Sequence, residues 1–248
     1  MNKRIAVVTG GIGGLGTEIC RSLARSGRKV IAADLGTRVD RVESFLADMR
    51  ESGDDVDFEA LDVSDFRNCA DFFGRIEKTG GTVSILVNAA GITRDTSLRK
   101  MSPEQWGDVL RVNLEGVFNV CRHVVDGMTN QGFGRIVNIS SVNGQTGQFG
   151  QTNYSAAKAG MHGFTMALAR EVAKKGVTVN SVSPGYCATA LVMAVPEDIR
   201  NQIIANIPVG RLGEPREIAR TVEFLAADDA GFITGANIPV NGGYFMDF

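Results

Sequence analysis

A cluster of five glycines between residues 9 and 16 limits the folds open to this chain more than any other feature. The cluster, TGGIGGLG, follows a short β-branched run at residues 4–9 and precedes a helical pattern that Gly27 ends. A buried strand, a glycine-rich turn and a helix in this order are typical of a dinucleotide-binding unit. Glycine lets the backbone approach a pyrophosphate, and the N-terminus of the helix offers free N–H groups and positive potential.

Short apolar runs and helical patterns alternate along the rest of the chain. The apolar runs predict strands at residues 29–33, 56–61, 83–87, 135–140, 177–182 and 237–240. The helical patterns lie at residues 37–51, 65–78, 103–128, which hold one or two helices, and 152–172. This alternation predicts a parallel sheet covered on both faces. We therefore expect a single-domain α/β fold over residues 1–248, a Rossmann-like, doubly wound parallel sheet flanked by helices.

Residues 191–208 lack a strand pattern and follow the sixth predicted strand at the carboxyl end of the sheet. They are equally consistent with a lid over the site and with a plain surface excursion.

Composition argues against several classes of function. A net charge of −2 gives no indication of a nucleic-acid or membrane partner. Four scattered cysteines without a C-x-x-C pair indicate reduced packing residues in a cytoplasmic protein. The two histidines have no ligand-type spacing, so we expect no metal site. We see no signal peptide and no apolar run long enough to cross a membrane.

The stretch 140–158 combines groups suited to proton transfer. Tyr154 and Lys158 are four residues apart on the predicted helix 152–172, so both lie on one face. A nearby cation favours a phenolate, and lowering the tyrosine pKa by about three units requires roughly 4 kcal/mol. Ser141 ends the preceding apolar strand, where ligands bind in open parallel sheets. Y-x-x-x-K alone is also common by chance on helix surfaces.

Asp34 directly follows the second predicted strand, about twenty residues after the glycine turn. An acidic residue there binds the ribose hydroxyls of NAD. The alternative is an ordinary turn residue at the end of a strand.

These motifs resemble, in order and spacing, those of the short-chain dehydrogenase/reductase family over essentially the whole chain. The motifs are T-G-x-x-x-G-x-G at 9–16, N-A-A-G at 88–91, Asn113, Ser141, Y-x-x-x-K at 154–158 and P-G-x-x-x-T at 184–189. The resemblance implies that Tyr154 is the general acid, Ser141 holds the substrate oxygen, Lys158 lowers the phenol pKa and binds ribose, and Asn113 anchors a water chain. It also implies cofactor contacts at Gly10, Gly13, Gly14, Leu15, Gly16, Asp34, Asp62, Val63, Asn88, Ala89, Gly91, Tyr154, Lys158, Pro184, Gly185 and Thr189.

Within this family, residues 140–160, GITRD at 91–95 and SPGY at 183–186 are most similar to acetoacetyl-CoA reductases of polyhydroxybutyrate synthesis. The resemblance implies reduction of an acyl-CoA thioester to (R)-3-hydroxybutyryl-CoA by a homotetramer. Substrate contacts are expected at Ser141, Gln148, Phe149, Gln151, Tyr154 and Tyr186. The alternatives are a 3-oxoacyl-[acyl-carrier-protein] reductase and, more remotely, a non-catalytic dinucleotide sensor.

Three positions predict a preference for NADH, with NADPH possible. Asp34 would repel the 2′-phosphate of NADP. Gly13 and Leu35 occupy positions where a basic residue could have bound that phosphate. Arg38 and Arg41 are the nearby cations that could weaken the preference.

Overall fold

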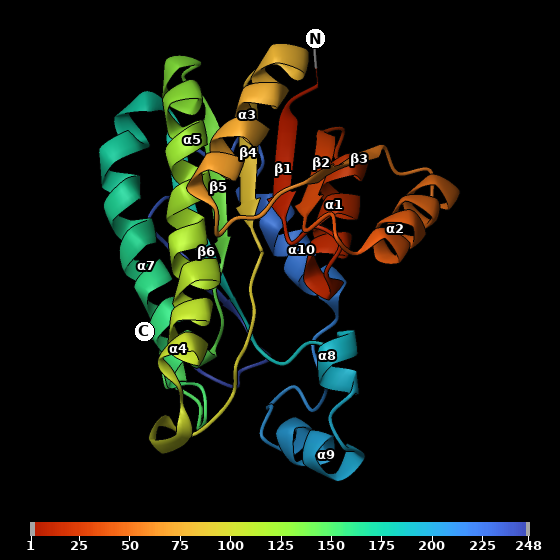
Figure 1. Cartoon of the computed structure of the whole chain (residues 1–248), viewed down its shortest axis with the longest axis vertical. Coiled ribbons are helices and arrows are strands. Elements are labelled where there is room, and N and C mark those ends of the chain that lie inside the picture. The colour runs from red at the N-terminus through yellow and green to blue at the C-terminus, as the bar shows by residue number, and fades with distance from the viewer. Residues whose placement is uncertain (1–2, 247–248) are drawn as a thin grey trace.

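Seven parallel strands form the central sheet of the computed structural model, which describes residues 3–246 (Figure 1). In chain order they are β1 (Ile5–Thr9), β2 (Lys29–Asp34), β3 (Val56–Ala60), β4 (Val83–Asn88), β5 (Gly134–Ile139), β6 (Val177–Pro184) and β7 (Asn237–Val240). Their order across the sheet is β3-β2-β1-β4-β5-β6-β7. The chain adds β2 and β3 on one side of β1 and then adds β4 to β7 on its other side, so the switch point lies between β1 and β4. The crevice beyond the carboxyl ends of strands at such a switch point is where doubly wound sheets bind ligands.

Helices cover both faces of this sheet (Figure 1). They are α1 (Gly14–Arg25), α2 (Val39–Glu51), α3 (Phe66–Gly80), α4 (Pro103–Leu110), α5 (Gly116–Asn130), α6 (Asn143–Thr146), α7 (Thr152–Val172), α8 (Ala190–Met193), α9 (Glu197–Ala205) and α10 (Pro215–Leu225), with short turns η1 (Leu98–Lys100), η2 (Arg111–Glu115) and η3 (Ala173–Lys175). Helices α3, α5 and α7 pack on one face, and α1, α2 and α10 on the other. The predicted single-domain doubly wound fold is therefore confirmed, although the first two and last two residues of the predicted domain lie outside the described residues.

Two-sided burial explains why the strands read as continuous apolar runs. In β1, Ile5 and Val7 enter the core under α3 and α5, whereas Ala6 and Val8 enter the core under α1 and α10. Successive strand residues point to opposite faces, so a strand covered on both sides needs apolar residues at every position.

The segment predicted as one or two helices at 103–128 contains a break in the regular helical repeat. Helix α4 begins with a capping box between Ser102 and Gln105. It then runs into α5 through η2, a π-helical turn at Arg111–Glu115 in which the Gly116 N–H reaches the Arg111 carbonyl. Such π turns are rare and occur often at functional sites.

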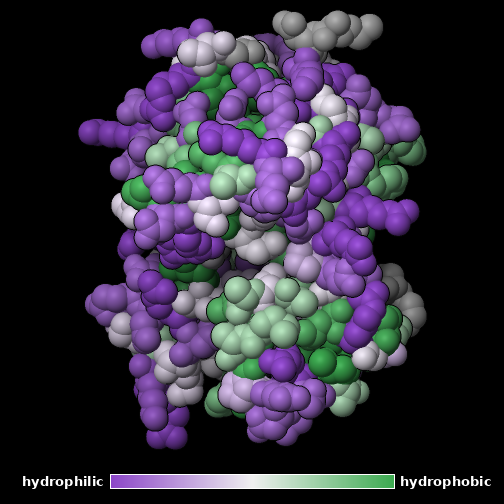
Figure 2. All heavy atoms as spheres, turned by 90° about the vertical axis from the view of Figure 1, so that its right-hand side faces the viewer, coloured by the Kyte–Doolittle hydropathy of each residue, from purple (hydrophilic) through white to green (hydrophobic). Residues whose placement is uncertain are grey.

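Residues 191–208 form two short helices beyond the carboxyl edge of the sheet. Arg200 of α9 donates to the carbonyls of Met193 and Val195, each at 3.2 Å, and so fixes α9 against the end of α8. Leu191, Met193 and Ile199 are exposed. Figure 2 shows an apolar patch over the lower part of the molecule, where Figure 1 places α8 and α9.

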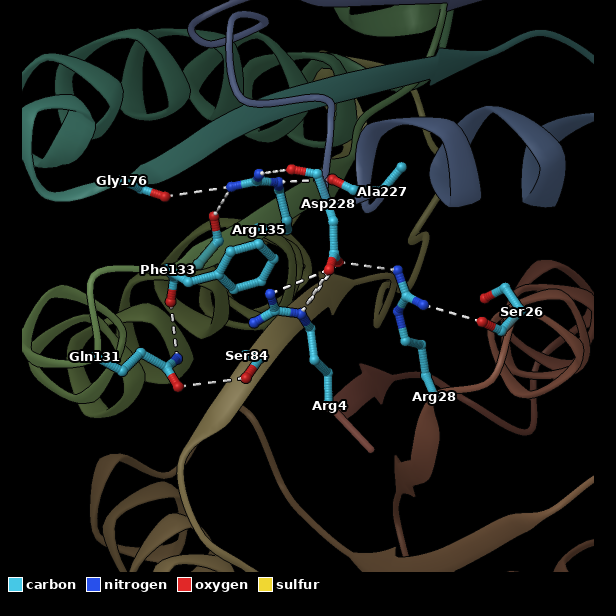
Figure 3. Close-up of polar contacts among 11 residues, drawn as sticks. Arg4, Ser26, Arg28, Ser84, Gln131, Phe133, Arg135, Gly176, Ala227 and Asp228 are labelled. Atoms are coloured by element: carbon cyan, nitrogen blue, oxygen red, sulfur yellow. Dashed lines mark hydrogen bonds and ion pairs between the residues drawn. The ribbon is translucent and has the colours of Figure 1, made fainter. Parts of the chain in front are cut away.

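At the opposite, amino edge, an arginine cluster joins distant segments (Figure 3). Buried Arg135 donates to the carbonyl oxygens of Gly134, Gly176, Ala227 and Asp228 at 2.9–3.2 Å. The Phe133 ring lies between two guanidinium groups, with Arg4 at 3.4 Å and Arg135 at 4.3 Å from its centroid. Arg4 and Arg28 both bind the Asp228 carboxylate. This cluster ties the segments before β1, β5 and β6 to the end of α10.

Among residues 3–246, no helix is long and apolar enough to cross a membrane. Within the same residues, no group of His, Cys, Asp and Glu side chains could hold a metal ion. All four cysteines are free and buried.

Candidate active site

Several positions of the glycine turn after β1 leave no room for a β-carbon. Gly10 has a φ of +65°, and a β-carbon there would lie 2.8 Å from the carbonyl oxygen of Ala89. A β-carbon on Gly16 would lie 2.1 Å from the Gly10 carbonyl oxygen. The turn therefore packs tightly between β4 and α1 and leaves the first N–H groups of α1 facing the crevice. Gly13 is the N-cap of α1 and offers no capping side chain.

A cleft of about 220 Å³ opens beside this turn. Of the predicted cofactor residues, it is lined by Gly10, Gly13, Asp34, Asp62, Val63, Ala89 and Gly91. The Thr9 hydroxyl accepts from the N–H groups of Ala89 and Ala90, each at 3.2 Å, and so holds the end of β4 against β1. A glycine cradle that admits no β-carbon, together with a helix N-terminus, fits the pyrophosphate of a dinucleotide.

Asp34 ends β2 at the mouth of this cleft. Its carboxylate accepts from the Leu35 N–H at 2.8 Å, so one oxygen is held while the side chain is only half-buried. Arg38 and Arg41 also line the cleft, and Arg41 donates to the carbonyl of Ile12 at 3.1 Å. The cleft is therefore lined by two carboxylates, those of Asp34 and Asp62, and by two guanidinium groups.

Other predicted cofactor residues lie at the carboxyl edge but outside this cleft. Thr189 packs over Gly14, where a β-carbon would come within 3.0 Å of the threonine side chain. The Pro184 carbonyl accepts from the Val142 N–H at 2.9 Å, and Gly185 donates to Val240 at 3.0 Å. Leu15 packs into the core below α1.

Asn88 differs from the prediction that it lines the cofactor cleft. Its side chain is buried and donates to the Asn138 carbonyl oxygen Oδ1 at 2.8 Å. Asn138 in turn donates to Thr165 of α7 at 2.9 Å. Asn88 therefore connects β4, β5 and α7 through side-chain hydrogen bonds.

Tyr154 and Lys158 lie on one face of α7, as their spacing predicts. Lys158 is 4 % exposed, and its ammonium nitrogen lies 5.5 Å from the centroid of the Tyr154 ring. That ammonium donates to the carbonyl of Ile139, the last residue of β5, at 2.7 Å. Next to Tyr154, buried Asn153 donates to the carbonyls of Arg94 and Gln105 and fixes the first turn of α7.

Among the protein's own groups, burial raises the pKa of Tyr154 above its ordinary value, the Ser141 hydroxyl opposes this rise, and Asp95 adds to it. Burial also lowers the pKa of Lys158 to about 8. The spacing Y-x-x-x-K predicts that the two groups are close, whereas their desolvation depends on the packing of the whole fold. The lowering of the phenol pKa by Lys158 together with a bound nicotinamide stays a prediction.

Asn113 is fully buried in the π turn and belongs to the same cluster. Its side-chain amide pairs with Ile92, accepting from the N–H at 2.8 Å and donating to the carbonyl at 2.9 Å. A β-carbon on Gly91 would lie 3.3 Å from Asn113 Oδ1 and 3.7 Å from the Lys158 ammonium. Asn113, Gly91 and Lys158 therefore meet at one point, where Gly91 lines the cleft.

Ser141 stands two residues after β5, at the start of a turn rather than at the end of the strand. Its hydroxyl accepts from the Asn143 N–H at 3.1 Å. The turn packs against α7, where a β-carbon on Gly144 would lie 2.9 Å from the Lys158 backbone. The strand ends at Ile139, and the Ser140 hydroxyl donates to the Lys158 carbonyl at 3.0 Å.

The predicted substrate residues are distributed around this turn. Gln148 and Phe149 are exposed, Phe149 at 89 %. Gln151 accepts from Asn143 at 2.8 Å and donates to Asp95 at 2.7 Å, so its amide is engaged within the loop. Tyr186 follows Gly185 and packs edge-on against Tyr244, with ring centroids 5.5 Å apart.

Known proteins resemble this chain over almost its whole length. A family model described as "Enoyl-(Acyl carrier protein) reductase" matches residues 10–245. An acetoacetyl-CoA reductase of Allochromatium vinosum is 55 % identical over 243 residues, which cover 98 % of this chain and 99 % of that protein. The chain belongs to the short-chain dehydrogenase/reductase family.

Two further relatives and one solved structure agree with this assignment. The acetoacetyl-CoA reductase of Cupriavidus necator is 52 % identical over 99 % of this chain and 100 % of that protein. The 3-oxoacyl-[acyl-carrier-protein] reductase FabG of Haemophilus influenzae is 42 % identical over the same shares. The structure titled "Crystal structure of gox2181" has a TM-score of 0.92 and 34 % identity over 98 % of this chain and 96 % of that one. The protein is thus an oxidoreductase of the short-chain dehydrogenase/reductase family.

Sequence reasoning missed several residues that position this short-chain dehydrogenase/reductase site. The Ile139 carbonyl that holds Lys158 and the amide of Asn153 have no motif of their own, because only the packing of α7 on β5 brings them into range. His162 lies one turn beyond Lys158 and contacts the Ser183 hydroxyl at 3.2 Å. His162 is four residues after Lys158, so the spacing places both on one helix face, and this signal in the sequence could have indicated it.

Proposed function

We propose that the protein reduces acetoacetyl-CoA to (R)-3-hydroxybutyryl-CoA, with a nicotinamide cofactor as reductant. The observation that carries the proposal is the meeting of Tyr154, Lys158 and Asn113 beside a glycine-built cleft. The relatives named acetoacetyl-CoA reductase, at 52–55 % identity, support the CoA thioester as substrate. The carrier-protein reductase, at 42 %, is the second candidate.

In this mechanism Tyr154 donates the proton to the β-carbonyl oxygen of the substrate. Ser141 donates a hydrogen bond to the same oxygen and orients the carbonyl toward the cleft. The cofactor supplies the hydride. Lys158 carries a labile proton and returns it to the phenol after each turnover. Asn113 fixes the Gly91–Ile92 backbone beside Lys158.

Tyr154 keeps its proton at neutral pH, since burial raises its pKa above the ordinary value of a phenol. A raised pKa also makes the phenol a weaker acid, so donation to the substrate oxygen depends on the groups that bind at the site.

For the cofactor we propose a preference for NADH. The residues that would hold it are the glycine turn, Asp62, Val63, Ala89, Gly91, Pro184, Gly185 and Thr189, with Asp34 at the adenosine ribose. The 2′-phosphate of NADP would meet the Asp34 carboxylate, and at about 5 Å and an effective dielectric near 20 each pair of unit charges repels by about 3 kcal/mol before screening. Arg38 and Arg41 reduce this margin, since both line the same mouth.

For the substrate we propose contacts at Ser141, Gln148, Phe149, Gln151, Tyr154 and Tyr186, with residues 191–208 as the lid. The apolar surface of α8 and α9 supports closure over a bound thioester, because exposed apolar patches gain stability by burial (Figure 2). The hydrogen bonds of Arg200 to Met193 and Val195 hold α9 against the end of α8.

For the assembly we propose a cytoplasmic homotetramer that serves polyhydroxybutyrate synthesis. The outer surface of α5 and α7 carries a shallow apolar cavity lined by Phe118, Val125, Phe164 and Leu168. Light scattering behind size-exclusion chromatography measures the mass directly, and a monomeric mass would contradict the tetramer.

The test of function is the oxidation of NADH and NADPH with acetoacetyl-CoA, acetoacetyl-carrier protein and an enoyl-CoA. We expect acetoacetyl-CoA to be the best substrate. A higher kcat/KM with the carrier protein would favour the second candidate, and turnover of the enoyl-CoA alone would exclude carbonyl reduction. Cofactor binding without turnover of any thioester would indicate a dinucleotide sensor.

The matched variants are Tyr154→Phe and Ser155→Ala. The first removes the proposed acid, so we expect kcat to fall by about 10²–10³-fold, while cofactor binding, followed by fluorescence, is retained. The second removes a neighbouring buried hydroxyl that has no hydrogen-bond partner among the described residues, so activity should be retained. Comparable activity in Tyr154→Phe and the native protein would refute the assignment.

A further inference from the structure

The chain closes on a short loop at residues 241–246, which one side chain holds at both ends. Buried Asn241 donates to the Phe245 carbonyl at 2.8 Å and accepts from the Gly243 N–H at 2.9 Å. Gly242 and Gly243 have φ values of +64° and +83°, which side chains rarely adopt. The loop therefore has one defined shape rather than the freedom of an ordinary terminal segment.

This loop packs against residues 207–209, which follow α9 and are called the return arm below. Val209 donates to the Gly242 carbonyl at 3.1 Å. A β-carbon on Gly242 would lie 2.8 Å from the Ile207 side chain, and one on Gly243 would lie 3.1 Å from that of Pro208. The loop and the return arm touch at these points, and together with Tyr186 they line a cavity of about 110 Å³.

The same loop presents Tyr244 to Tyr186. The two rings pack edge to face at an interplanar angle of 75°, a geometry that aromatic quadrupoles favour. Burial and the neighbouring Tyr244 raise the pKa of the Tyr186 phenol. Two residues before Tyr186, the Pro184 carbonyl binds the Val142 N–H, one residue from Ser141. The backbone that leads to Tyr186 is therefore joined to the serine turn, and its ring packs against the terminal loop.

We propose that Tyr244 is a specificity-determining residue, which fixes the Tyr186 ring as a rigid wall against the acyl end of the thioester. The proposal rests on the proposed function, since it requires Tyr186 to face the acyl group. A wall braced by the edge of a second ring cannot swing away, so it accepts the four-carbon β-ketoacyl group and rejects longer chains. The terminal loop also ties this wall to the return arm of the lid.

The experiment compares kcat and KM of native protein, Tyr244→Leu and Tyr244→Phe with acetoacetyl-CoA and 3-oxohexanoyl-CoA. Loss of the ring in Tyr244→Leu should raise KM for acetoacetyl-CoA about fivefold and lower the preference for the shorter thioester by about the same factor. KM for the cofactor should stay within about twofold of native, because the cleft is lined by other residues. Tyr244→Phe keeps the ring edge and should behave as native.

A double-mutant cycle with Tyr186→Leu distinguishes bracing from independent effects. If Tyr244 acts through Tyr186, the second substitution adds little once Tyr186 is gone. Tyr244→Met, which keeps bulk without a ring, replaces Tyr244→Leu if that variant does not fold, and cofactor binding by fluorescence reports folding.

Two outcomes separate this proposal from the proposed function. Unchanged KM and chain-length preference in Tyr244→Leu, or additive effects in the cycle, would overturn the role of Tyr244 while leaving the reductase intact. If only carrier-protein thioesters are reduced, the preference for the four-carbon over the six-carbon substrate is measured with the carrier-protein thioesters instead. Native protein that reduces neither kind of thioester would overturn both proposals.

Discussion

Replacing Lys158 with methionine should abolish reduction and at the same time stabilise the fold. Lys158 is buried without a carboxylate partner, and burial alone lowers its pKa from 10.5 to about 8. In the unfolded chain the ammonium returns to water and its pKa returns to about 10.4. The folded protein therefore bears the cost of a desolvated charge at neutral pH.

The difference in pKa sets the size and the pH window of this cost. A fall from 10.5 to about 8 corresponds to about 3 kcal/mol, at 1.36 kcal/mol for each tenfold change in proton affinity. Below pH 8 both states are protonated and the full cost is present. Between pH 8 and about 10.4 the unfolded state binds the additional proton, so stability rises with pH until the cost disappears.

Methionine removes the charge but also removes the donor that the Ile139 carbonyl uses. An unsatisfied buried carbonyl costs about 1–3 kcal/mol, so we expect a net gain of about 1 kcal/mol at pH 7. For a chain of this length that gain raises Tm by about 2–4 °C. The advantage should reverse as the pH approaches 10, because native protein then loses its own penalty while the variant still lacks the donor to Ile139.

Urea denaturation at pH 7 and pH 9.5, at one protein concentration and without cofactor, measures both quantities. Lys174→Met is the matched control, since Lys174 is exposed and its replacement should leave the pH dependence of stability unchanged. A Lys158→Met protein less stable than native at pH 7, or one with the native dependence on pH, would refute the reasoning.

Three further outcomes are expected. Native protein should favour NADH over NADPH in kcat/KM by about tenfold, or about 1.4 kcal/mol, and Asp34→Ser should lose most of that margin; a native preference for NADPH would contradict the role of Asp34. Gly16→Ala should weaken cofactor binding, measured by fluorescence titration, by at least about tenfold, because its β-carbon would collide with the Gly10 carbonyl; native affinity would show that the turn can move. In urea, Arg135→Met should cost about 2–4 kcal/mol because buried carbonyls lose their donor, whereas Asp228→Ala should cost less than about 1 kcal/mol because its ion pairs are exposed; equal costs would contradict this contrast.

Elements governed by local pattern could be predicted from the sequence. The bounds of α7 and β7 agree with the structure, since α7 is rich in alanine and methionine and β7 is a short isolated run. Boundaries that depend on pairing with a neighbouring strand could not be predicted from the sequence. Strand β6 extends to Pro184 because it pairs with Val240, a partner that the local sequence does not reveal.

The site shows the same division. The motif residues Asn113, Tyr154 and Lys158 come together as the spacing predicts, because strand ends and helix faces carry them to one edge. The π turn around Asn113 was not predicted, since it depends on the pairing of that buried amide with Ile92. The burial that raises the pKa of Tyr154 was not predicted, because it is a property of the whole fold.

The placement of the terminal loop has a practical consequence for handling the protein. Residues 241–246 follow β7 at the carboxyl edge of the sheet, beside Tyr186, whereas the chain enters β1 from the opposite edge (Figure 1). An affinity tag fused before β1 would therefore extend away from the substrate entrance. A tag fused after Phe248 would be attached next to the loop that carries Tyr244. Chain-length preferences measured on such a fusion would therefore describe the tagged protein rather than the native one.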